Sequence, residues 1–135
     1  MKDAEKRALQ IAVLVGSLVP IIAGGAGMLL GPWMAESAPR GLDSHFRYLS
    51  GLLFAIGLGY VSTVPRIETQ GRRFLLLTGI VFAGGIGRLV SLIVIGSVSP
   101  SMTAALAMEL LVTPALALWQ RRIERRNARN TVLEG

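Results

Sequence analysis

The sequence predicts an all-α fold, a transmembrane four-helix bundle, from three observations. The mean hydropathy of the chain is +0.57, and 52% of its 135 residues are hydrophobic, which is more than a soluble domain of this length carries. Only 16% are charged, and those residues lie between long apolar runs instead of along amphipathic faces. Four runs approach the ~20 residues that cross ~30 Å of hydrocarbon as a helix. None shows the two-residue alternation of a barrel strand.

The four predicted spans belong to one domain that ends in a basic tail. They cover residues 8–30, 46–64, 74–96 and 100–119, and the tail covers 120–135. Ser99 followed by Pro100 is a favourable start for the fourth helix. Pro20 and Pro114 lie inside the first and fourth spans, where each frees a carbonyl and is expected to bend its helix.

Basic residues are divided unevenly between the two ends of the spans. Eleven of the 14 Lys and Arg residues lie in the N-terminus, the middle connection and the tail, and only two lie in the opposite connections. Because Lys and Arg accumulate on the cytoplasmic side, both termini are predicted to be cytoplasmic. Trp33 and Trp119 lie at opposite edges, where aromatic residues gather. The net charge of +6 therefore indicates topology and attraction to membrane lipids, and not nucleic-acid binding.

The first apolar run also resembles a secretory signal, since AES precedes Ala38 and loosely fits a cleavage site. The apolar region of a signal spans roughly 7 to 15 residues. This run is nearer to 23, so a retained anchor is favoured.

Sixteen glycines in so short a chain require an explanation. Small residues four positions apart let membrane helices approach closely. Several pairs have this spacing, among them Gly27 and Gly31, Ala55 and Gly59, and Ala83 and Gly87. Packing within one bundle is the simpler interpretation, and an outward-facing motif that forms a homo-oligomer is the alternative.

Two ionisable residues lie within predicted spans, Arg88 in the third and Glu109 in the fourth. A charge at a helix centre costs about 2.5 to 3.5 kcal/mol on insertion scales, so such residues are usually paired. Arg88 precedes Gly96 by eight residues, and Glu109 follows Pro100 by nine. At ~1.5 Å per residue, both should lie roughly 12 to 14 Å below the outer surface. Consecutive antiparallel helices can therefore bring them together.

Polar neighbours extend this pair into a predicted pocket that opens outward. Arg47, at the outer start of the second helix, is expected to reach toward Glu109, and two arginines facing one glutamate would attract an anion. The predicted ligand-binding residues are Arg47, Arg88, Glu109, Asp43, His45, Tyr48 and Ser91. A purely structural ion pair, a ligand site and a proton relay or catalytic site all remain open.

Enzyme and metal motifs are weak in this sequence. Asp43, Ser44 and His45 are triad residue types, but adjacent positions do not create triad geometry. With one His and no Cys, a transition-metal site would depend on carboxylates. No catalytic residue, metal or cofactor is therefore predicted, although an enzyme that uses Glu109 as acid or base stays an alternative.

Four segments resemble a bacterial family of small four-span membrane proteins classed as a domain of unknown function. They are DSHFRYLSGLLFAIGL, VPRIETQGRRFLLL, GGIGRLVSL and MELLVTPALALWQRR. The family is loosely similar to the DoxX-like proteins and, more distantly, to a vertebrate receptor-assembly chaperone. The resemblance implies a fold and candidate positions, namely Arg47, Arg88 and Glu109, and no activity. The function predicted from the residues is binding of a lipid-like or small anionic molecule by a protein of the bacterial inner membrane, with an accessory or assembly role. An oligomeric channel or transporter subunit is the alternative.

Overall fold

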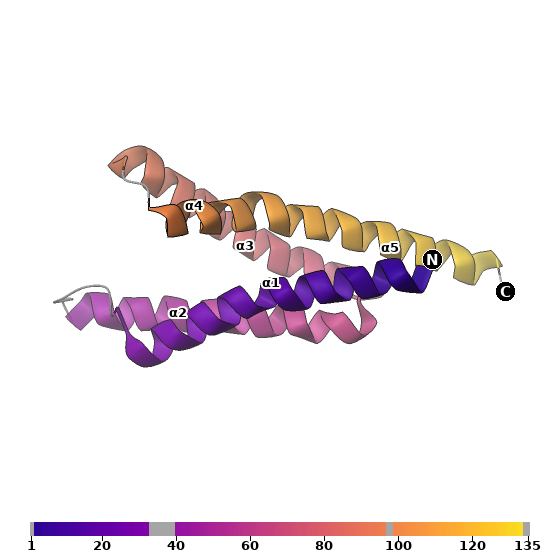
Figure 1. Cartoon of the computed structure of the whole chain (residues 1–135), viewed down its shortest axis with the longest axis horizontal. Helices are drawn as coiled ribbons and strands as arrows, with labels where there is room; N and C mark the ends of the chain where they lie inside the picture. Colours follow the sequence, from indigo (N-terminus) through magenta and orange to yellow (C-terminus); the bar gives the residue numbers. More distant parts are fainter. Residues whose placement is uncertain (1, 33–39, 97–98, 134–135) are drawn as a thin grey trace. The chain divides into compact units, whose positions relative to one another are not determined.

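The computed structural model describes residues 2–32, 40–96 and 99–133 and confirms the all-α fold class (Figure 1). No strand occurs in those three ranges. The long helices are α1 (Lys2–Leu30), α2 (Arg40–Thr63) and α3 (Gly71–Ile95). A fourth helical stretch combines α4 (Pro100–Ala107), the π-helical turn η2 (Met108–Val112) and α5 (Thr113–Leu133), and a short 3-10 turn, η1 (Val64–Arg66), follows α2.

Four helical stretches are long and apolar enough to cross a membrane, the pattern of a multi-pass membrane protein. They cover Asp3–Leu30, Gly41–Arg66, Gly71–Ile95 and Pro100–Arg129. Large apolar side chains along them are exposed, including Leu29 at 74% and Val94 at 77%. In water such surfaces would be unfavourable, whereas hydrocarbon accommodates them. Of the two predicted edge tryptophans, Trp119 lies in α5, and Trp33 lies outside the described residues.

Contacts between residues divide the chain into two compact units. One unit comprises Gln10–Pro65, and the other comprises Met1–Leu9 together with Arg66–Gly135. The first contains most of α1 and all of α2, and we call it the α1–α2 unit. The second, the α3–α5 unit, contains the start of α1 and the remaining helices. Each unit is described by itself below.

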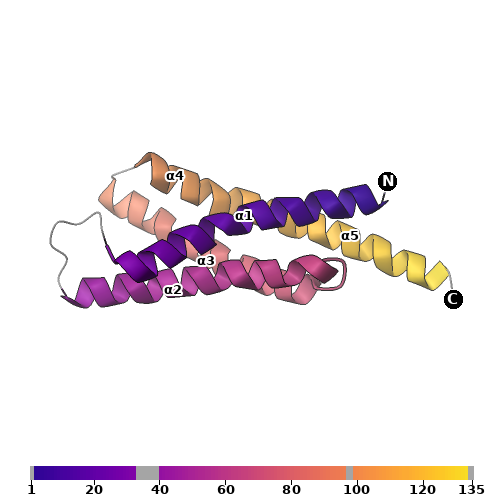
Figure 2. The same ribbon diagram turned by 60° about the horizontal axis from the view of Figure 1, so that its bottom comes forward.

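The α1–α2 unit is an antiparallel helical hairpin, whose two helices lie side by side in Figures 1 and 2. A Cβ atom on Gly24 would lie 2.5 Å from the backbone nitrogen of Phe54 and 2.7 Å from the carbonyl oxygen of Ser50. Only a glycine permits so close an approach of two backbones. Near the other end of the hairpin, Gln10 Nε2 donates to the Val64 carbonyl at 2.8 Å. The hairpin is therefore held along its length.

The α3–α5 unit pairs α3 with the long fourth stretch in antiparallel fashion. Near the start of α3, the buried side chain of Gln120 donates through Nε2 to the Ile67 carbonyl at 2.8 Å. Phe74 and Ile67 are both fully buried beside this bond. This end of the unit therefore combines buried apolar side chains with a buried side-chain amide that has a hydrogen-bond partner.

Local signals in the sequence set the ends of the fourth stretch. Ser99 caps α4 as predicted, because its Oγ accepts from the Met102 amide at 3.2 Å, and Pro100 follows in the first helical turn. The helix does not stop at the predicted boundary of residue 119. It continues to Leu133, since the tail contains no Gly or Pro within the helical part that would end it.

Candidate functional site: an ion pair at a π-helical turn

Arg88 and Glu109 form an ion pair across the α3–α5 unit, which confirms that these two residues meet. Arg88 Nε donates to Glu109 Oε2 at 3.1 Å, and Nη2 donates to Oε1 at 3.1 Å. This is the bidentate geometry that makes arginine–carboxylate pairs both strong and directional. The pair is less buried than expected, with side chains 40% exposed for Arg88 and 17% for Glu109. Gly84, one turn away on α3, offers no side chain to cover the guanidinium.

Glu109 lies in a π-helical turn, η2, which the sequence did not predict. The Thr113 amide donates to the Met108 carbonyl, five residues back, instead of to the residue four back. The Thr113 hydroxyl donates to the same carbonyl at 2.8 Å. Pro114 follows directly and has no N–H for the Leu110 carbonyl, which accounts for the widened turn. The proline thus changes the helix locally at the acidic residue.

Gly85 allows α3 to approach this turn closely. A Cβ atom on Gly85 would lie 3.0 Å from the Glu109 Cβ and 2.7 Å from Leu110 Cδ2. The glycine that faces η2 is therefore Gly85, and Gly87 has open space around it within the described residues. Packing through Ala83 and Gly87 stays a prediction. The short distance at Gly85 keeps the Glu109 carboxylate within reach of the guanidinium one turn further along α3.

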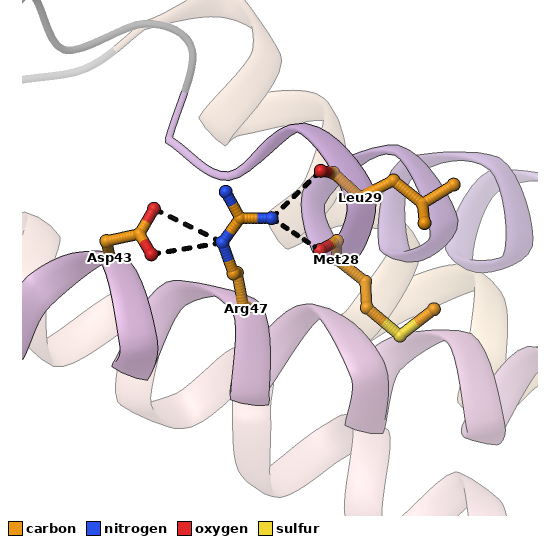
Figure 3. A network of polar contacts seen from close by, with 4 residues as sticks. All are labelled: Met28, Leu29, Asp43 and Arg47. Carbon is orange, nitrogen blue, oxygen red and sulfur yellow. Dashed lines mark hydrogen bonds and ion pairs between the residues drawn. The ribbon is translucent and has the colours of Figure 1, made fainter.

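A second polar cluster lies at the end of the α1–α2 hairpin where the end of α1 meets the start of α2 (Figure 3). Arg47 Nε donates to Asp43 Oδ2 at 3.0 Å, a contact between residues at i, i+4 spacing on α2. Arg47 Nη1 donates to the carbonyls of Met28 at 2.9 Å and Leu29 at 2.8 Å. Those carbonyls belong to the last turn of α1, where helix geometry leaves no intrahelical donor. Arg47 therefore caps a helix C-terminus, where a cation is also favoured by the helix dipole.

The end of α1 is shaped for this contact. Gly31 has φ +73°, and its amide donates to the Gly27 carbonyl at 3.0 Å, which is the left-handed C-terminal cap that favours glycine. A Cβ atom at Gly31 would lie 2.6 Å from Arg47 Nη2 and 2.7 Å from Asp43 Oδ1. The absent side chain makes room for the ion pair.

The remaining predicted site residues are placed separately. His45 and Tyr48 lie on α2, both exposed, with ring centroids 6.4 Å apart. Ser91 lies on α3, partly exposed and one turn from Arg88. The structure thus gives two polar clusters, Asp43 with Arg47 in one unit and Arg88 with Glu109 in the other. The single predicted pocket that contains both clusters stays a prediction.

Ion pairs also gather at the start of α1, within the α3–α5 unit. Glu5 contacts Arg126 at 2.6 Å and Arg122 at 3.9 Å, and Lys6 contacts Glu68 at 2.9 Å. Burial by itself raises the pKa of Glu68, but the hydrogen bond and charge of Lys6, helped by Arg66, outweigh it, so the pKa is lowered from 4.5. The second carboxylate oxygen of Glu68 is buried without a hydrogen-bond partner.

Chemically, both arginine clusters suit the binding of anions. Guanidinium groups recognise carboxylate or phosphate by two parallel hydrogen bonds. No group of three His, Cys, Asp or Glu side chains that could hold a metal ion occurs in the part of the chain that the structure describes. Each cluster is therefore one arginine with its acidic partner, Arg47 with Asp43 in one unit and Arg88 with Glu109 in the other.

The fold and the ion pair define a class, a small helical protein with four candidate spans, two of which are joined by an arginine–glutamate pair. Residues 8–120 match the family described as Domain of unknown function (DUF4345), and the chain belongs to that family. No curated protein and no solved structure matches the chain. Similarity to the DoxX-like proteins stays a prediction.

Sequence reasoning missed the main-chain partners of Arg47 and the π turn at Glu109. The carbonyls of Met28 and Leu29 carry no residue-type signal, although a glycine at the end of an apolar run is a sign of a helix cap. The π turn had a clearer sign, because a proline five residues after an acidic residue in a span disturbs the bonding of that turn. Thr113, just before this proline, supplies the extra donor.

Proposed function

We propose that the chain is a multi-pass membrane protein that binds a lipid-like or small anionic molecule at Arg88, in the outer half of a bacterial inner membrane. The observation that carries this proposal is the bidentate pair of Arg88 with Glu109. Of the five N–H groups of a guanidinium, this pair uses two. No described residue accepts from Nη1, and the side chain is 40% exposed. A second anion can therefore bind the free edge while Glu109 holds the group in place.

The depth of Arg88 supports an amphipathic ligand. Helix α3 has 25 residues, so at ~1.5 Å per residue it is about 37 Å long and exceeds the ~30 Å of hydrocarbon by about 7 Å. Arg88 precedes Ile95, the last residue of α3, by seven residues. Its Cα is then about 10 Å from the end of the helix and, with the excess length shared equally between the two ends, about 7 Å inside the hydrocarbon boundary. Arginine side chains extend from such a depth to the headgroups. A phosphate or carboxylate at the interface is within reach, with apolar tails beside α3.

The π turn at Glu109 supports a functional role for the pair. Such turns are rare, add strain to a helix and occur frequently at functional sites. A structural ion pair would need only regular helix geometry. The widened turn instead frees carbonyl groups next to the carboxylate, which adds acceptors at the place where a ligand with a hydroxyl or ammonium group would bind. An accessory role, in which the bound lipid is presented to a partner protein, is compatible with this site.

The test is native mass spectrometry of the gently extracted full chain in the presence of phosphatidylglycerol. We expect the double variant Arg88→Gln/Glu109→Gln, which removes the site without leaving an unpaired charge, to retain one lipid fewer than the unmodified protein. Arg72→Gln, an exposed arginine at the opposite end of α3, is the matched control and should retain the lipid.

Equal lipid retention by the double variant and the unmodified chain would exclude Arg88 as the binding residue. The same spectra report the oligomeric state. Multimers that retain no lipid would favour the alternative, a channel or transporter subunit, because four helices alone rarely enclose a pore. Monomers that retain a lipid which the double variant loses would support binding at Arg88.

A further inference from the structure

Helix α5 carries a dense basic surface beyond the predicted span. Five arginines lie within nine residues, and we call them the arginine stripe: Arg121, Arg122, Arg125, Arg126 and Arg129. The helix does not break between the span and the stripe, so these side chains project from one rigid element. Several are four residues apart, a spacing at which like charges destabilise an isolated helix. A counter-charge would remove this repulsion.

The protein supplies only part of that counter-charge. Glu5 pairs with Arg126 at 2.6 Å and lies 3.9 Å from Arg122. Arg121, Arg125 and Arg129 form no ion pair with any described residue, and all three are exposed. These three follow one another at four-residue spacing along one face of the helix. An external anion would therefore meet three aligned guanidinium groups.

A groove accompanies the stripe. Its volume is about 320 Å³, and it is lined by the five arginines and by Leu118. Leu118 is 68% exposed and lies at the membrane end, whereas Arg129 lies at the far end. The groove is thus apolar at one end and cationic along the rest. This polarity fits a molecule with an acyl chain at one end and phosphates at the other.

The length of the arginine stripe indicates which kind of lipid headgroup it can bind. Measured from Trp119 at ~1.5 Å per residue, Arg121 is about 3 Å, Arg125 about 9 Å and Arg129 about 15 Å further along the helix. The headgroup layer on each side of a bilayer is roughly 5 to 8 Å thick. Basic residues that only orient a helix in the membrane need to lie within that layer. Arg125 and Arg129 lie beyond it, so orientation alone does not account for them. Their extended side chains can return toward the layer and contact a second phosphate.

We infer that the arginine stripe binds an anionic phospholipid with two phosphate groups, in the leaflet where α5 leaves the membrane. The acyl chains lie against Leu118, one phosphate contacts Arg121 and the other contacts Arg125 and Arg129. This site is separate in the sequence and in chemistry from the pair of Arg88 and Glu109. It requires no change in the ion pairs of Glu5.

The test is a titration of the detergent-solubilised full chain with cardiolipin, followed by native mass spectrometry. Each membrane-proximal cation contributes roughly fivefold in affinity, so Arg125→Gln/Arg129→Gln should weaken binding on the order of 25-fold. Neither residue forms an ion pair within the described part of the chain, so the fold should persist. Arg7→Gln/Arg72→Gln removes two exposed cations from the same predicted side of the membrane and should change binding less than twofold.

Further variants and ligands distinguish a phospholipid with two phosphates from other occupants of the arginine stripe. Arg125→Lys/Arg129→Lys keeps the charge but loses the paired donors, and should give an intermediate affinity. Phosphatidylglycerol, with one phosphate, should bind more weakly than cardiolipin, and binding of cardiolipin should persist in Arg88→Gln/Glu109→Gln. The inference would be wrong if Arg125→Gln/Arg129→Gln and Arg7→Gln/Arg72→Gln lost the same affinity for cardiolipin. It would also be wrong if Arg125→Gln/Arg129→Gln lost none. Displacement of cardiolipin by an equal concentration of pyrophosphate would show that free phosphate, and not a lipid, is the occupant.

Discussion

Arg88 and Glu109 are 21 residues apart in the chain and face each other through two parallel hydrogen bonds, each 3.1 Å long. Each charge alone would be unfavourable in hydrocarbon by about 2.5 to 3.5 kcal/mol. Together they form a neutral unit whose guanidinium keeps a free edge. The pair therefore both joins α3 to η2 and offers a binding group, and the two roles can be separated by mutation.

Substitution of the pair should be strongly non-additive. We expect Arg88→Met and Glu109→Gln each to lower the thermal unfolding temperature in detergent, and the double variant to lose less than the sum. Since hydrogen bonds between membrane helices average below 1 kcal/mol and reach about 1.7 kcal/mol, a coupling of about 1 kcal/mol is expected. Arg72→Gln combined with Glu109→Gln is the control, and its two effects should add.

The backbone contact at Gly24 predicts a severe effect of a single methyl group. In Gly24→Ala the new Cβ would meet backbone atoms of Phe54 and Ser50, which cannot rotate away. Overpacking of this kind costs typically 1 to 3 kcal/mol, measurable by chemical unfolding in mixed micelles. Gly16→Ala, on the same helix with open space around it, should be neutral or stabilising through helix propensity. Equal stability of the two variants would contradict the close approach of α1 to α2.

Loss of the helix cap at Arg47 should act locally. Arg47→Gln removes the donor to the carbonyls of Met28 and Leu29, so the last turn of α1 should open more often. Hydrogen–deuterium exchange of the amides near Gly31 should accelerate several-fold, because about 1 kcal/mol of capping energy corresponds to a factor of about five. Exchange near Gln10, at the other end of the hairpin, should not change and serves as the internal control.

The pairing of Glu68 with Lys6 predicts a defined pH response. The folded pKa of Glu68 is lowered, so this contact stabilises the fold above the unfolded value of about 4.3 and is lost as pH falls through the folded pKa. Lys6→Met should raise the pKa of Glu68, because burial then acts with less opposition. Carbon NMR of labelled glutamate would follow the titration. Arg7→Met makes the same change in net charge without a direct contact and should shift this pKa less.

Much of the fold was predictable because a membrane-spanning helix appears in the sequence as an apolar run of about 20 residues. Apolar runs bounded by Ser99 and Pro100 define a helix start, and the equal depths of Arg88 and Glu109 were sufficient to predict their pairing. Both inferences use rules that depend only on chain length and residue type. The antiparallel order of consecutive helices then follows from short connections.

The details of the site were less predictable because they depend on backbone partners. Arg47 was expected to reach toward Glu109, but within its unit its hydrogen bonds go to Asp43 and to the end of α1. Such a cap requires knowledge of where α1 ends and that Gly31 has a positive φ. The extension of α5 past residue 119 was missed for a different reason. Hydropathy detects where a helix leaves lipid and not where it stops.

The contacts that hold α1 against α2 come from residues of the hairpin itself. Its hydrogen bond between Gln10 and Val64, its backbone contact at Gly24 and its cap by Arg47 involve only residues from the first half of the chain. During translation these residues leave the ribosome before α3 does. The α1–α2 hairpin can therefore form and enter the bilayer while α3 is still being synthesised. Insertion into the membrane can then proceed in two steps and does not depend on the complete polypeptide.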